Sequence, residues 1–64
     1  MEIVKAVCSQ CKFKRHFYVM NGFIVSEKGH QTIIHSFKHK HIIIIDNVKC
    51  IATDEHHLIA IGDD

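Results

Sequence analysis

The stretch Ile42-Ile43-Ile44-Ile45 decides the fold class of this chain. β-Branched residues fit the pleated surface of a sheet, and successive side chains of a strand point to opposite faces, so both faces of this strand have to be covered. One layer of a 64-residue chain can cover one face of its sheet but hardly both. We therefore expect a second copy of the chain on the other face, because large exposed apolar areas normally mark interfaces. The alternative is a two-layer sandwich that buries the stretch within one chain.

Turn signals separate this stretch from other short segments rich in Val, Ile, Phe and Tyr. The strongest signal is Asn21-Gly22, which suits a type I′ turn that pairs Arg15–Met20 with Phe23–Lys28. The predicted strands are 2–7, 14–20, 23–28, 31–37, 41–46, 48–53 and 57–62. The predicted fold class is therefore all-β: a small antiparallel meander of about seven short strands, forming a single domain over residues 1–64.

A helix is the alternative for the segment from Ser26 to His41. Ser26 is a suitable N-cap, and a helix would carry Ile33, Ile34 and Phe37 on one face, with His35 and His39 one turn apart. Against the helix, Gly29 would lie inside it at a cost of about 1 kcal/mol, and the segment adjoins the β-branched stretch. The strand is the favoured prediction.

The composition limits the class of protein. Apolar residues make up 47% of the chain and charged residues 23%, which excludes intrinsic disorder. No apolar run approaches the roughly 18 residues of a membrane-spanning helix, and the N-terminus lacks the features of a signal peptide. We therefore expect a cytoplasmic protein without a membrane partner. Three cysteines are an odd number, which argues for reduced thiols. A net charge of +1 leaves any nucleic-acid binding to local clusters of positive charge.

Four landmarks in the sequence carry a family resemblance. They are Ile3-Val4-Lys5-Ala6-Val7, Phe23-Ile24-Val25-Ser26-Glu27-Lys28, Ile33-Ile34 and Phe37. In this order and spacing they resemble the tryptophan-activated RNA-binding attenuation protein (TRAP) family. The resemblance runs through nearly the whole chain, although no single motif in it is specific.

The resemblance implies a closed homo-oligomeric ring of about eleven or twelve subunits, with sheets that continue across subunit boundaries. Such rings wrap single-stranded RNA and regulate transcription attenuation or translation. The resemblance implies that Phe23 stacks on a base, whereas Glu27 and Lys28 bind base edges. Lys49 is the nearest candidate for a second RNA-binding anchor that the family carries on a later strand.

Local charge adds a second mode of RNA binding. The densest cationic stretch runs from Lys38 to His41, and Lys38 and Lys40 are candidate phosphate contacts. Residues 12–16 form a second cationic stretch. The short loop Met20–Phe23 and the basic loop 36–41 replace the loops that enclose tryptophan in the TRAP family, so we do not expect dependence on tryptophan.

The cysteines and histidines support a rival hypothesis, a small zinc-knuckle interaction module. Cys8-x-x-Cys11 has the spacing of a zinc knuckle, and Cys50 or a pair among His35, His39 and His41 would complete four ligands. The favoured prediction assigns no metal ligand, with Cys8 and Cys11 as ordinary thiols at a turn. We expect a binding protein rather than an enzyme, because a packed meander of this size leaves little room for a substrate cleft.

Overall fold

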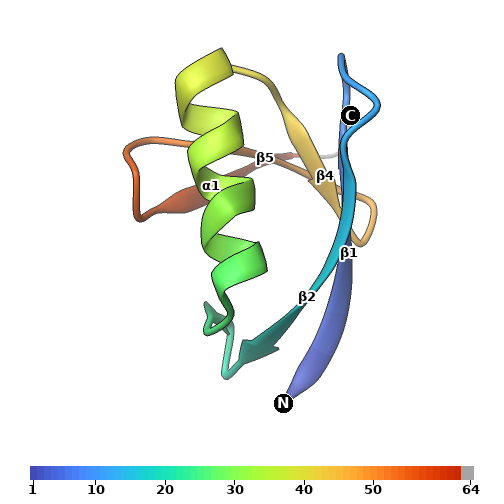
Figure 1. The fold of residues 1–64 in the computed structure, drawn as a ribbon, viewed down its shortest axis with the longest axis vertical. Coiled ribbons are helices and arrows are strands. Elements are labelled where there is room, and N and C mark those ends of the chain that lie inside the picture. The colour runs from blue at the N-terminus through green and yellow to red at the C-terminus, as the bar shows by residue number, and fades with distance from the viewer. Residues whose placement is uncertain (63–64) are drawn as a thin grey trace.

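Six strands and one helix make up the computed structural model, which describes residues 1–62. The elements are β1 (Glu2–Cys8), β2 (Lys14–Met20), β3 (Phe23–Ile24), α1 (Glu27–His39), β4 (Ile43–Ile45), β5 (Val48–Ala52) and β6 (Leu58–Gly62). The strands form one antiparallel sheet in the order β3-β2-β1-β4-β5-β6, and α1 stands against one face of this curved sheet (Figure 1). The predicted antiparallel sheet of short strands is confirmed, and assembly into a ring stays a prediction.

Two tight hairpins set the strand registers. Asn21 and Gly22 have φ angles of 52° and 82°, and the turn pairs Met20 with Phe23 as predicted. Asp46 and Asn47 have φ angles of 49° and 70° and connect β4 to β5. Positive φ at both central residues is the requirement of a type I′ turn, whose twist matches that of the flanking strands.

The segment 27–39 is a helix, so the predicted strand 31–37 is wrong, and the predicted strand 23–28 ends at Ile24. The side chain of Ser26 caps α1 by accepting a hydrogen bond from the Gly29 N–H at 3.2 Å. The helix ends at Lys40, which adopts the left-handed conformation with a φ of 54°. These local signals outweigh the β-branched residues because capping and a buried helix face both favour the helix.

The helix face that packs on the sheet is made mainly of small residues. The buried residues of α1 are Gly29, Thr32, Ile33 and Ser36. They recur at the helical spacing of three and four residues, and they let α1 approach closely to the core formed by the sheet. The core cluster consists of Val4, Ala6, Cys8, Phe17 and Ile43.

Gly29 marks the closest approach of α1 to the sheet. A Cβ atom added there would lie 2.8 Å from Cδ2 of Phe17 and would also collide with Cγ2 of Ile24. Gly29→Ala should therefore lower the free energy of unfolding by about 1–3 kcal/mol, although Ala is ordinarily the better helix former. Chemical denaturation measures this effect, with the exposed Lys28→Ala variant as the control. An increase in stability for Gly29→Ala would contradict the close packing.

The face of the sheet turned away from α1, here named the outer face, is only partly covered. In the isoleucine stretch Ile43 is completely buried against α1, whereas Ile44 points outward and is half-buried. Large apolar side chains on this face that remain exposed include Ile3, Tyr18, Met20 and Ile59. No helix within residues 1–62 is long and apolar enough to cross a membrane.

Candidate metal centre

Two cysteines lie where β1 leads into the β1–β2 loop, at one end of the molecule. Cys8 is the last residue of β1 and is buried, whereas Cys11 lies in the loop and is exposed. The backbone N–H of Cys8 donates to Phe13 O, and that of Ser9 donates to Ile42 O, both at 3.0 Å. These bonds hold the loop between the starts of β2 and β4. The backbone N–H of Gln10 donates to Cys8 Sγ at 3.4 Å.

The C-terminal end of α1 brings two histidines to the same end (Figure 1). His35 lies in the last two turns, and its ring stacks on Phe13 with a centroid separation of 4.4 Å. His41 follows Lys40, whose left-handed conformation turns the chain back after the helix. The buried Ser36 fixes this turn: its hydroxyl donates to His41 O at 2.8 Å and accepts from the Ala52 N–H at 3.0 Å.

The four side chains Cys8, Cys11, His35 and His41 offer ligand atoms that all lie within 4.8 Å of one another. Nδ1 of His41 is 3.4 Å from Sγ of Cys8 and 3.4 Å from Sγ of Cys11. In a tetrahedral zinc site, bond lengths of about 2.3 Å to sulfur and 2.0 Å to nitrogen place sulfur and nitrogen about 3.5 Å apart. The sulfur–nitrogen distances around His41 therefore already match the edges of a zinc tetrahedron.

The protonation state favours a metal at His35 and opposes it at Cys11. Burial lowers the pKa of His35, and the charges of His39, His41 and Arg15 lower it further. His35 is thus held in the neutral form that ligates metals. Nε2 of His35 is buried and has no hydrogen-bond partner among the described residues, and a bound ion is one of the few explanations for such an atom. Loss of hydration raises the pKa of Cys11, and a hydrogen bond and charge interaction with Cys8 add to this effect.

Two of the candidate ligands that the sequence left open lie outside the four-residue group. Cys50 lies on β5, buried in the sheet, and is not part of the four-residue group. Its thiol donates to Val48 O at 3.5 Å, and burial raises its pKa. The ring of His39 is 4.9 Å from that of His35 between centroids but also stays outside the group. The spacing His35-x₅-His41 lies within the range of Cys₂His₂ sites, but so does His35-x₃-His39, so spacing alone does not identify the pair.

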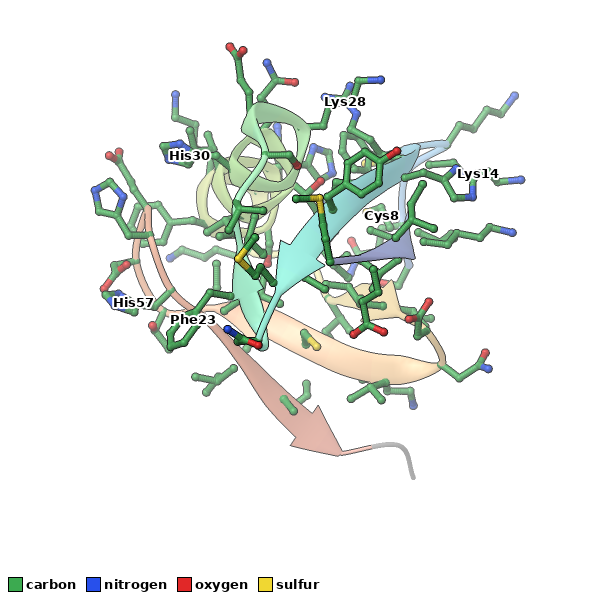
Figure 2. All side chains as sticks on the ribbon, turned by 90° about the horizontal axis from the view of Figure 1, so that it is seen from below. Cys8, Lys14, Phe23, Lys28, His30 and His57 are labelled. Atoms are coloured by element: carbon green, nitrogen blue, oxygen red, sulfur yellow. The ribbon has the colours of Figure 1, made fainter. Side chains whose placement is uncertain are left out.

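The residues expected to bind RNA lie on different elements. Phe23 is on β3, Glu27 and Lys28 are in the first turn of α1, and Lys49 is on β5. Phe23 lines a hollow of about 680 Å³ together with His57, and Lys28 lines another of about 540 Å³ together with Arg15. Figure 2 shows Phe23 beside His57, well away from Lys14. The two further candidates, Lys38 and Lys40, lie at the C-terminal end of α1.

Comparisons of this chain with models of protein families, with curated proteins and with solved structures find no match.

Proposed function

We propose that this chain is a small zinc-binding module in which Cys8, Cys11, His35 and His41 hold one structural Zn²⁺. The observation that carries the proposal is the convergence of two thiols and two imidazoles within 4.8 Å of one another. They come from segments far apart in the chain: the ligand atoms of Cys8 and His41 are 3.4 Å apart but 33 residues separate them in the sequence.

The complete set of four protein ligands favours a structural role over a catalytic one. Catalytic zinc sites keep a coordination position for water or substrate, whereas structural sites close all four with cysteine and histidine. In the proposed site, zinc would tie the β1–β2 loop to the end of α1 and so join the helix to the sheet. A short chain with a small core gains most from such a link.

The hydrophobic core of the module is small. The buried hydrophobic core within residues 1–62 consists of seven side chains, two of them cysteines. The three cysteines are free thiols, so no disulfide supplements that core. A bound metal is therefore the cross-link that the described residues are arranged to supply in place of a disulfide.

Metal content measures the proposal directly. The purified chain should bind one equivalent of Zn²⁺, quantified by elemental analysis and native mass spectrometry. Cys11→Ser and His41→Ala should each reduce the affinity at least tenfold, whereas Cys50→Ser and His39→Ala, the two neighbouring candidates outside the group, should keep one tightly bound zinc. A chain that binds no zinc, or one that loses it only with Cys50→Ser, would overturn the proposed site.

A further inference from the structure

We propose that the outer face of the sheet binds single-stranded nucleic acid through a patch formed by Lys5, Lys14, His16 and Tyr18. None of these four residues is a proposed zinc ligand, so this inference goes beyond the proposed function. The occupant is defined by its chemistry: a flexible polyanion whose bases are free to stack, as in single-stranded RNA or DNA.

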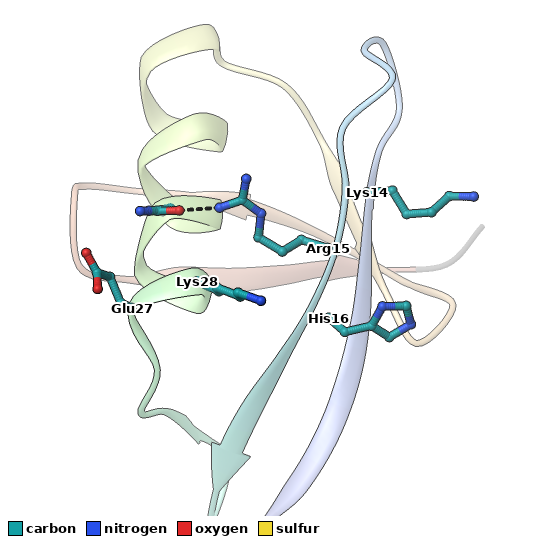
Figure 3. Close-up of a pocket in the computed structure, with 6 residues that line it drawn as sticks. Lys14, Arg15, His16, Glu27 and Lys28 are labelled. Carbon is teal, nitrogen blue, oxygen red and sulfur yellow. Dashed lines mark hydrogen bonds between the residues drawn. The ribbon is translucent and has the colours of Figure 1, made fainter.

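The pairing of β1 with β2 places the patch on one face. Val4 and Ala6 of β1 and Phe17 of β2 are buried on the side of α1, so the alternate residues point outward. Lys5 lies opposite His16, and Ile3 lies opposite Tyr18. Figure 3 shows the side chains of Lys14 and His16 pointing away from α1, on the far side of β2 from Arg15. All four residues of the patch are exposed.

Charge segregation makes the patch complementary to a polyanion. The six strands contain a single acidic residue, Glu2, which lies opposite Val19 on the side of α1. The carboxylate of Asp46, in the turn between β4 and β5, accepts a hydrogen bond from the Lys5 backbone N–H at 3.2 Å. No carboxylate within residues 1–62 forms a salt bridge with the side chain of Lys5 or Lys14. The exposed side chains of Lys5 and Lys14 are therefore available to bind phosphate groups.

Tyr18 supplies the second element of single-strand recognition. Half of its surface is exposed, and it stands next to the exposed Ile3 on the same face. An exposed aromatic ring on a sheet is a platform on which a base can stack, and flanking lysines can hold the backbone. Bases within a duplex have no free face for such stacking, so the patch should select single strands.

A second copy of the chain fits this face less well. In a symmetric pair of sheets packed through their outer faces, each patch would meet the same patch of its partner. That contact would bring lysine against lysine, with only Asp46 of the β4–β5 turn, already bonded to the Lys5 backbone, beside each patch within residues 1–62. Nucleic acid relieves this repulsion, whereas a second copy would increase it.

Fluorescence anisotropy with labelled 15-nucleotide oligo(U), oligo(dT) and a duplex of the same length tests the proposal on the zinc-loaded chain. Both single strands should bind more tightly than the duplex. The double variant Lys5→Ala/Lys14→Ala should bind at least tenfold more weakly, and the slope of log K against log salt should fall by about 1.4, the effect of two lost phosphate contacts. Tyr18→Ala should bind at least fivefold more weakly, whereas Tyr18→Phe should retain wild-type affinity.

The matched control is Lys28→Ala/Lys38→Ala, which removes the same charge from exposed positions of α1 and should change affinity less than twofold. Circular dichroism and zinc content establish that each variant is folded, which separates failure of this proposal from failure of the zinc site. Loss of binding in the control but not in the Lys5/Lys14 variant would overturn the proposal. Failure of the folded wild-type chain to bind single strands at 50 mM salt would also overturn it. The same holds if an outer-face variant turns a dimer into a monomer while its nucleic-acid affinity stays unchanged.

Discussion

Removal of the metal should unfold the protein at room temperature or lower its melting temperature by tens of degrees. Structural zinc contributes about 10–16 kcal/mol of binding free energy in zinc-finger peptides, which is as large as the total stability of a typical domain, about 5–15 kcal/mol. The core of this chain is small, and the proposed ligands join its two structural layers. Thermal unfolding followed by circular dichroism, with one equivalent of Zn²⁺ or with excess EDTA, measures the difference.

Two variants separate a specific site from general binding to thiols. Cys11→Ser should abolish the zinc-dependent rise in melting temperature, whereas Cys50→Ser should keep that rise even though its own stability falls, because Cys50 is buried. Equal melting temperatures for the zinc-loaded and EDTA-treated wild-type chains would contradict a structural metal.

The zinc-dependent stabilisation should also increase with pH between 6 and 8. The raised pKa of Cys11 keeps its thiol protonated in the metal-free chain. Zinc must displace that proton, so zinc binds more tightly as the pH rises. The lowered pKa of His35 has the opposite role: this imidazole is already neutral and releases no proton. Calorimetric titrations in two buffers of different ionisation enthalpy count the protons.

The sheet could be predicted from the sequence because strand composition and turn chemistry are local properties. Asn21-Gly22 and Asp46-Asn47 both form the turns that their residues favour. The helix was missed for an equally physical reason. Its buried face uses Gly29, Thr32 and Ser36, so the apolar periodicity that normally identifies a helix was weak. The need for Gly29 at a close helix–sheet contact became visible only in three dimensions.

The candidate site was half predictable. The pair Cys8 and Cys11 was evident from its spacing, but three histidines within seven residues offered several partners. The choice depends on where α1 ends, because the left-handed Lys40 carries His41 back toward Cys8. The RNA-binding set of Phe23, Glu27 and Lys28 assumed one continuous strand, and the strand ends before Glu27.

Opposite outcomes are expected when Asp replaces two adjacent isoleucines of the stretch Ile42–Ile45. Ile43 is completely buried between the sheet and α1, so Ile43→Asp would place a carboxylate in the core without a partner and should prevent folding at neutral pH. Ile44 points to the outer face, half-buried between Val7 and Lys49. Ile44→Asp should therefore stay folded, with a loss of stability of about 1–2 kcal/mol. Circular dichroism and chemical denaturation compare the two variants.

The Ile44→Asp variant also tests how the outer face is used. In the ring predicted from the TRAP resemblance, both faces of this strand are dry, and an Asp at either position should break the assembly. If the outer face instead meets solvent and nucleic acid, size-exclusion chromatography with light scattering should give Ile44→Asp the same mass as the wild-type chain, near the 7.4 kDa of one subunit. A wild-type mass several times larger that collapses in Ile44→Asp would place this isoleucine in a subunit interface. The charges of Lys5 and Lys14 would then need partners across that interface, because both side chains lie on the same side of the sheet as Ile44.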